Sequence, residues 1–163
     1  MKTARDFELD CRRLRQHLIE VLPAKLGASM LEETRTNFRN ESYGNDDVRK
    51  RWPERRYEDK LTYPKLRYTG RLFRSIQPKV HRISSRAAVV SLGSPLSYAQ
   101  MHNEGWRPGM PVTGSTLRQP PSATKRVWLP RRPKQRQYMG IGRRSVRKFM
   151  QVIRKEVNAA MRK

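Results

Sequence analysis

The feature that most constrains the fold is a row of apolar side chains that recurs at helical spacing from Phe7 to Phe38. Consecutive members lie three or four residues apart, so a helix would place them on one face. Pro23 interrupts the row, and a proline inside a helix removes a hydrogen bond and destabilises the helix by about 3 kcal/mol. We therefore predict two helices, or one kinked helix, within residues 1–40, with Pro23 early in the second. The row comprises Phe7, Cys11, Leu14, Leu18, Leu22, Leu26, Met30, Thr34 and Phe38, and the opposite face carries Arg5, Arg12, Glu20, Lys25, Glu32, Glu33 and Arg39.

The C-terminal segment contains the clearest amphipathic pattern in the chain. Its apolar face comprises Val146, Phe149, Met150, Ile153, Val157, Ala160 and Met161, and much of the rest is Arg143, Arg144, Arg147, Lys148, Arg154 and Lys155. This pattern predicts a helix that packs through one face. Arg143 and Arg144 fall near its N-terminal end, where the helix dipole disfavours cations.

Between these helices the sequence indicates a β-hairpin followed by a short helix. Residues 79–84 and 87–92 are short segments typical of strands, and residues 84–86 form a plausible hairpin connection. A short helix can then run through Leu96, Tyr98, Ala99 and Met101 and end at Gly105, because glycine is common at helix C-termini. Residues 127–130 are a candidate third strand.

These elements predict an α+β fold with N-terminal helices, a small antiparallel β-sheet and a C-terminal amphipathic helix packed on that sheet. We expect one domain over residues 1–163. Its segments would be N-terminal helices at 1–40, a loop or arm at 41–64, the hairpin region at 65–105, a long loop at 106–126, and a strand, basic loop and C-terminal helix at 127–163.

Charge is distributed unevenly along the chain, whose formal net charge is +23. Residues 1–60 carry a net charge of only +2. Residues 61–163 hold 23 Lys and Arg against two acids, Glu104 and Glu156, for a net charge of +21. So basic a segment repels itself unless an anion lies nearby, and a nucleic acid, an acidic protein surface or an anionic membrane could supply it.

The sequence offers little for catalysis or for metal and cofactor binding. His17, His81 and His102 are far apart, and the single cysteine, Cys11, lies in the apolar row, where we expect it to pack as a small hydrophobe. No apolar run approaches the roughly 20 residues of a membrane span, and residues 1–10 lack the apolar core of a signal peptide. We expect a protein that is not an enzyme, binds no metal or cofactor and contacts no membrane.

Two further patterns have a plain structural interpretation. The acidic pairs at residues 46–47 and 58–59 lie in polar segments, where we expect solvated carboxylates without a role in acid–base catalysis. Gly140, Ile141 and Gly142 precede a helix, as in a phosphate-binding loop, but the rest of a nucleotide motif is missing. We interpret this segment as a simple turn into the helix.

Nucleic-acid binding remains an alternative function for the basic segment 61–163. Its cations alternate with aromatic residues, as at 126–128 and 136–138, and would give salt-sensitive affinity without sequence preference. However, no zinc finger, helix-turn-helix or RNA-recognition motif is present. The same cations could instead face acidic patches on neighbouring protein subunits.

The order of short motifs resembles one protein family. Thr69-Gly70-Arg71-Leu72, with Ser75 and Ile76, precedes the hairpin, and Tyr98-Ala99, His102 and Gly105 follow it. Arg132-Pro133 and Tyr138-Met139-Gly140 then precede the last helix, although residues 134–137 separate two parts that family members tend to join. In this order the chain resembles the phage virion morphogenesis and tail-completion family, which includes head–tail joining proteins. The region of Trp52 is similar to that family's tryptophan-bearing segment.

This resemblance implies a structural protein of a tailed bacteriophage. It would form a homo-oligomeric ring, a hexamer by the family's pattern, in the neck that joins the tail to the head connector. Its partners would be further copies of itself, the tail terminator or tail tube, head-completion or connector proteins and, in the channel, DNA. Its location would be the virion, after assembly in the host cytoplasm. Candidate interface or basic residues are Trp52, Arg126, Arg131, Lys134, Arg136, Arg143 and Arg144, and the long loops 41–64 and 106–126 are candidate contact segments.

Overall fold

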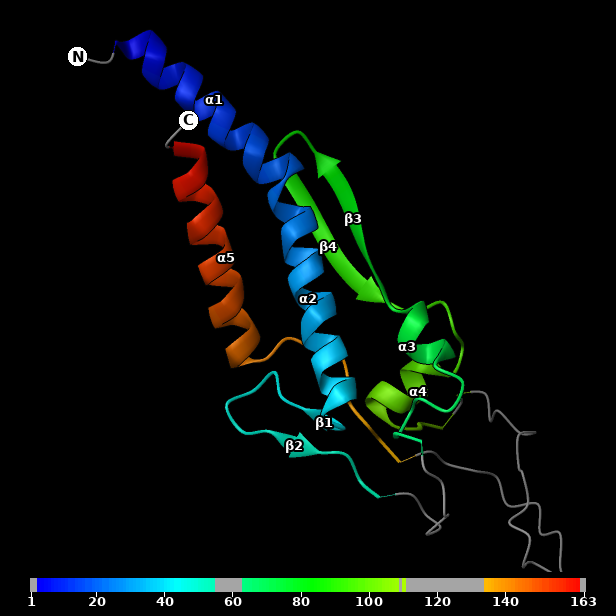
Figure 1. The fold of residues 1–163 in the computed structure, drawn as a ribbon. Helices are drawn as coiled ribbons and strands as arrows, with labels where there is room; N and C mark the ends of the chain where they lie inside the picture. Colours follow the sequence, from blue (N-terminus) through cyan, green and yellow to red (C-terminus); the bar gives the residue numbers. More distant parts are fainter. Residues whose placement is uncertain (1–2, 55–62, 109, 111–133, 162–163) are drawn as a thin grey trace, which may run out of the picture.

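The computed structural model of the protein describes residues 3–54, 63–108, 110 and 134–161 (Figure 1). Within these residues the chain forms an α+β fold, as expected from the sequence. Its elements are α1 (Ala4–Glu20), α2 (Leu22–Arg39), β1 (Ser42–Tyr43), β2 (Lys50–Arg51), α3 (Arg71–Ser75), β3 (Gln77–Ser84), β4 (Ala87–Gly93), α4 (Ala99–Glu104) and α5 (Arg143–Met161). Among the described residues, no helix is both long enough and apolar enough to cross a membrane.

The predicted break near Pro23 divides the N-terminal helices. Helix α1 begins with a capping box, in which the Thr3 hydroxyl and the Asp6 carboxylate each accept a backbone N–H from the other residue. Helix α2 follows after Val21, and Pro23 lies in its first turn, where the missing N–H is harmless. The buried members of the apolar row, Leu22, Thr34 and Phe38, all lie in α2, whereas Phe7 in α1 is 66% exposed.

Helix α2 lies at the centre of the fold, between the β3–β4 hairpin and α5 (Figure 1). Gly27 allows its close approach to the hairpin, because a Cβ at this position would lie 2.9 Å from Cβ of Pro78 and 3.4 Å from Val90. Contacts on two sides bury a wide arc of α2. For this reason Glu33, which we expected on the exposed face, is in fact buried.

The hairpin confirms both predicted strands and extends them slightly. β3 and β4 are antiparallel, with Val80 opposite Val90 and His81 opposite Val89, and the register shifts near Ser84. In β4, alternate residues such as Val90 and Leu92 are half-buried, as expected for a strand with one covered face. The other face remains exposed, including Val89 at 47%.

Residues 41–54 contain a small ladder that the sequence did not predict. We expected a loop here, but β1 pairs with β2 in an antiparallel register, with Ser42 opposite Arg51. The N–H of Trp52 extends the ladder by donating to the carbonyl of Glu41 at 2.8 Å. The candidate strand at 127–130 and most of the loop 106–126 lie outside the described residues.

Helix α5 contacts both helices and sheet, and its largest contacts are with α1 and α2. Its packed face is rotated relative to the predicted one. Phe149, Ile153 and Val157 are half-buried as expected, whereas Val146 and Met150 are 49% and 45% exposed. The centre of the packed face instead holds two polar residues, Ser145 and Glu156, which are buried.

Two buried carboxylates attach α5 to the N-terminal helices. Glu33 of α2 accepts a hydrogen bond from the Ser145 hydroxyl at 2.7 Å and pairs with Lys148 at 3.1 Å. Glu156 of α5 pairs with Lys25 at 2.6 Å and lies 3.1 Å from His17 Nε2. The hydrogen bond from Lys25, and then the one from His17, holds the pKa of Glu156 below its usual range. Because buried charges require partners, these pairs fix the register of α5 on the fold.

Candidate functional site

Four residues of the short sequence motifs, Leu72, Ile76, Ala99 and Tyr138, lie in a single hydrophobic cluster. We call this cluster, which also contains Phe38 and Trp52, the motif core. Phe38 of α2 lies at its centre, with its ring 5.4 Å from Trp52 and 5.0 Å from Tyr138 between centroids. These are distances at which aromatic pairs attract beyond simple burial. Segments that are far apart in the sequence therefore share one core.

The Thr-Gly element forms the short helix α3. Gly70 adopts a left-handed conformation, with φ of 68°, immediately before the helix. The N-cap of α3 is Gly70, which has no side chain to cap it, and the hydroxyl of the preceding Thr69 accepts a hydrogen bond from the N–H of Arg71 at 3.3 Å. Ser75 then hydrogen-bonds through its hydroxyl to the hydroxyl of Ser94 at 2.7 Å. This contact ties α3 to the segment that follows the hairpin.

The Tyr-Ala element forms α4, and Gly105 ends this helix as predicted. Gly105 has φ of 87°, a conformation that favours glycine. Ala99 is buried, and the ring of Tyr98 packs edge-on against His102 at 6.0 Å. Burial, together with the nearby Arg136, lowers the pKa of His102 to about 4, so its ring is neutral at pH 7.

Residues 134–142, which we call the strap, cross the fold through hydrogen bonds to their backbone. The carbonyl of Tyr138 accepts from Asn37 Nδ2 at 3.1 Å, and that of Gly140 accepts from Asn45 Nδ2 at 2.6 Å. Asn103 Oδ1 accepts from the N–H groups of Tyr138 and Met139 at 3.0 and 2.9 Å. Three asparagine amides thus hold an extended segment that pairs with no strand among the residues described by the structure.

The side chain of Tyr138 anchors the strap in the motif core. It is fully buried, and its hydroxyl donates to the carbonyl of Ala99 at 2.8 Å. Burial raises the pKa of this hydroxyl. Tyr138 therefore acts as a neutral packing and hydrogen-bonding group that links the strap to α4.

The glycine segment at the end of the strap does not form a phosphate cradle. The N–H groups of Arg144 and Ser145, in the first turn of α5, already donate to the carbonyl of Asn45 at 3.0 and 3.3 Å. A Cβ at Gly142 would collide with the Asp46 carboxylate and the Asn45 carbonyl. The glycine permits close packing of the β1–β2 loop, as the interpretation of a simple turn predicted.

Two residues that we predicted as interface candidates are instead engaged within the subunit. Trp52 is 3% exposed, and its indole N–H donates to the carbonyl of Gln137 at 2.7 Å. The Arg136 guanidinium donates to the carbonyls of Pro53 and Glu54 at 3.2 and 3.3 Å. Trp52 therefore lies in the motif core because it holds the strap, and its ring is not available to a partner.

The remaining basic candidates divide into two groups. Lys134, Arg143 and Arg144 are exposed, the last two at the start of α5. Arg126 and Arg131 lie outside the described residues, as do the motif residues Arg132 and Pro133. Two of the three exposed basic candidates that the structure places therefore lie on α5.

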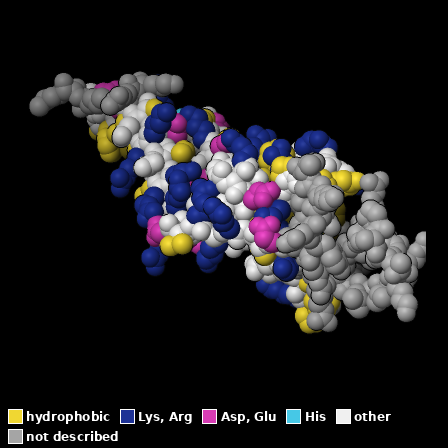
Figure 2. Space-filling model, turned by 60° about the horizontal axis from the view of Figure 1, so that its bottom comes forward, with side chains coloured by type: hydrophobic (Ala, Val, Ile, Leu, Met, Phe, Trp, Pro, Cys, Tyr) yellow, Lys and Arg dark blue, Asp and Glu magenta, His cyan; other side chains and the backbone are white. Residues whose placement is uncertain are grey.

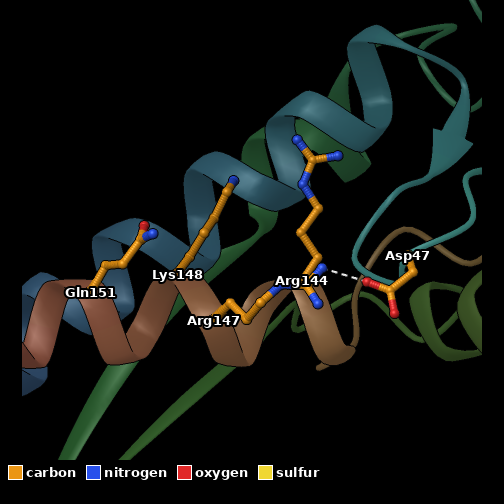
Figure 3. A pocket seen from close by; sticks show the side chains of 5 residues that line it. All are labelled: Asp47, Arg144, Arg147, Lys148 and Gln151. Atoms are coloured by element: carbon orange, nitrogen blue, oxygen red, sulfur yellow. Dashed lines mark hydrogen bonds and ion pairs between the residues drawn. The ribbon is translucent and has the colours of Figure 1, made fainter.

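One face of α5 carries six cations, which we call the cationic strip: Arg143, Arg144, Arg147, Lys148, Arg154 and Lys155. At its N-terminal end, Asp47 forms an ion pair with Arg147 and lies 3.9 Å from Arg143. Asp47, Arg144, Arg147, Lys148 and Gln151 line an open hollow of about 350 Å³ (Figure 3). In Figure 2, Lys and Arg side chains are spread over the visible face, with few acidic ones among them.

Large apolar side chains also remain exposed on the helices. Phe7 is 66% exposed on α1, and Val146, Met150 and Met161 are 49%, 45% and 58% exposed on α5. Val146 and Met150 are four residues apart and so lie on one side of α5, which we call its apolar edge. Contiguous exposed apolar side chains commonly mark an interaction surface.

Several residues that organise the site carry no recognisable signal in the sequence. Asn37, Asn45 and Asn103 are polar residues near element ends, where asparagine is ordinary, and their partners lie up to about 100 residues away in the chain. Glu33 and Glu156 could have been suspected, because each falls within the apolar arc of its helix at steps of three, four or seven residues. Such a polar residue in an apolar arc indicates a buried partner.

The part of the chain described by the structure contains no group of three or more His, Cys, Asp or Glu that could hold a metal ion. Asp47 faces the cations of α5, and the pair at 58–59 lies outside the described residues. Comparison with protein-family models, with curated proteins and with solved structures found no match to this chain.

Proposed function

We propose that this protein is a neck or tail-completion subunit of a tailed bacteriophage, which assembles into a ring that joins the tail to the head connector. The proposal starts from the ordered motifs that resemble this family. Their buried residues Leu72, Ile76, Ala99 and Tyr138 are all part of the motif core. Because these motif residues serve folding, the surface residues can differ according to the partner that the subunit contacts. This arrangement suits a structural subunit.

The observation that carries the proposal is the apolar surface left uncovered on a fold whose core is already built. Phe7 on α1 and the apolar edge of α5 are exposed, whereas the six residues of the motif core are already buried. Burying such surface is favourable by about 25 cal/mol per Å². A ring places a patch of one subunit against a different patch of the next, so both helices can be covered in the assembly.

The test measures assembly of the full chain alone and with tail tubes. Sedimentation velocity gives the mass of the particle, and negative-stain electron microscopy shows whether it is a ring. We expect a closed ring that attaches to one end of the tail tube. The double variant Val146→Asp/Met150→Asp should abolish the ring while preserving circular dichroism, because both side chains are already exposed.

The matched control is Gln77→Asp/Ser97→Asp, which adds the same charges at exposed positions away from α5. It should assemble like the unaltered chain. A monomer without affinity for tail components would overturn the proposal. If that monomer bound nucleic acid tightly at physiological salt, the alternative function as a nucleic-acid-binding protein would replace it.

A further inference from the structure

The cationic strip has the geometry of an extended binding surface. Its members recur at steps of three, four and seven residues, which places them on one side of α5. Arg143, Arg147 and Lys148 have side chains 86%, 64% and 45% exposed. The neutral residues between them on this side, Gln151 and Asn158, are also exposed and can donate hydrogen bonds.

Half of the strip has no internal anion to neutralise it. Arg147 and Arg143 share Asp47, and Lys148 pairs with buried Glu33. For the other three cations, Arg144, Arg154 and Lys155, the structure gives no ion pair within the residues it describes. Three exposed cations on one rigid helix therefore require an anion from outside the subunit or from solution.

The composition of the strip distinguishes between two kinds of acidic partner. Protein interfaces have cores that are depleted in charge and enriched in aromatic and apolar side chains. Interfaces with nucleic acids are far more positively charged and more polar. The strip contains cations and amides, and the apolar residues of α5 lie on its other sides. It therefore suits a phosphate backbone better than an acidic protein surface.

The length of the cationic strip also agrees with the spacing of phosphates along duplex DNA. From Arg143 to Lys155 the helix rises by about 18 Å, at 1.5 Å per residue. Phosphates on one strand of a duplex advance by about 3.4 Å along the axis, so the strip spans about five of them. We propose that the cationic strip of α5 binds the phosphate backbone of duplex DNA without reading its sequence. The proposal does not rest on ring formation, because a monomer presents the same strip.

Asp47 provides a variant in which binding should increase. Its carboxylate competes with phosphate for Arg147 and Arg143 and repels an approaching anion. Asp47→Asn should therefore tighten DNA binding severalfold. Glu104→Gln on α4, which removes the same charge away from the strip, should not.

The experiment measures binding of the full chain to a 30-base-pair duplex of arbitrary sequence by fluorescence anisotropy at several salt concentrations. Each phosphate contact contributes about 0.9 to the slope of log K against log salt. The triple variant Arg144→Gln/Arg154→Gln/Lys155→Gln should lower the slope by about 2 to 3, and the affinity at 0.1 M salt on the order of 100-fold. Arg13→Gln/Arg15→Gln/Arg86→Gln, with the same net charge, is the matched control and should keep the original slope.

Two further probes separate the anion sources. Single-stranded RNA should bind more weakly with a shallower slope, because its charge density is lower. Polyglutamate, a substitute for an acidic protein surface, should bind more weakly still. Equal slopes for the two triple variants, no gain from Asp47→Asn, or stronger binding to polyglutamate than to DNA would each overturn the proposal. Particle mass, measured by sedimentation without DNA, tests the ring separately.

Discussion

Removal of the Asn37 side chain should unfold the strap from the rest of the protein. Its amide is 2% exposed and makes three hydrogen bonds: Nδ2 donates to Asn45 Oδ1 at 2.8 Å and to the Tyr138 carbonyl at 3.1 Å, and Oδ1 accepts from the Gly44 N–H at 3.0 Å. Asn37→Ala leaves these three buried groups without their partner. Each such group costs about 1–3 kcal/mol, and because water can enter the vacated space we take the lower value for each. The free energy of unfolding should fall by about 3 kcal/mol.

The assay is urea denaturation followed by far-ultraviolet circular dichroism at one fixed protein concentration, since assembly would couple to stability. With a slope of roughly 2 kcal/mol per M, the midpoint should fall by about 1.5 M. Asn158→Ala, at an exposed position on α5, is the matched control and should remain within about 0.5 kcal/mol of the unaltered chain. A loss below about 1 kcal/mol for Asn37→Ala would refute the idea that the asparagine network fixes the strap.

Asn37→Asp adds a test whose sign depends on pH. The carboxylate would keep an acceptor for the Gly44 N–H but would face two acceptors, Asn45 Oδ1 and the Tyr138 carbonyl, in a buried site. Burial and these acceptors would raise its folded-state pKa above the unfolded value of about 4. The neutral form would then be favoured in the folded state, so the destabilisation relative to the unaltered chain should be larger at pH 8 than at pH 5. Equal destabilisation at both values would indicate that position 37 is solvated.

Three other predictions concern packing, backbone conformation and charge. Gly27→Val should lower the free energy of unfolding by about 2 kcal/mol, because its Cβ would press against Pro78. Gly93→Val should have a much smaller effect on the urea midpoint, because the space around Gly93 is open. Gly105→Val should lower it by about 1–2 kcal/mol, because φ of 87° strains any residue with a Cβ, and an unchanged melting temperature would contradict this reason. The depressed pKa of Glu156 implies a contribution to stability that is present at neutral pH and is lost as pH falls through the folded-state pKa. Glu156→Gln should therefore make the urea midpoint less dependent on pH between pH 3 and 5.

The sequence predicted the parts of the fold that depend on local periodicity. The break at Pro23, the hairpin strands, the short helix ending at Gly105 and the C-terminal helix each follow from spacing and from special backbone residues. Glu33 was assigned to the wrong face, although it lies seven residues after Leu26 and three after Met30 and therefore falls within the apolar arc of α2. The predicted apolar face of α5 is likewise rotated from the face that packs. The reason is that two ion-paired, buried carboxylates, Glu33 and Glu156, help to fix the register of α5.

The sequence could not reveal what holds the strap or the β1–β2 ladder. Two-residue strands have no detectable alternation, and Asn45 has one partner eight residues away and another 95 residues away. Trp52 appeared to be a surface aromatic because its neighbours are polar and charged. Its burial follows from the path of the strap, whose Gln137 carbonyl receives the indole N–H. Such contacts depend on tertiary structure that no local pattern encodes.

The first turn of α5 shows how stability and surface chemistry compete in this fold. Two arginines at the positive end of a helix dipole each destabilise it by about 0.3–1 kcal/mol. The β1–β2 loop offsets this effect, since Asn45 caps the first turn with its carbonyl and Asp47 pairs with Arg147 and lies near Arg143. Arginines at this end of a helix are locally unfavourable, and here a distant loop compensates for them. Such compensation is typical of residues that are retained for a function other than folding. Arg144 has no compensating ion pair among the described residues, so its removal should stabilise the subunit and, if the cationic strip binds DNA as proposed, should also weaken that binding.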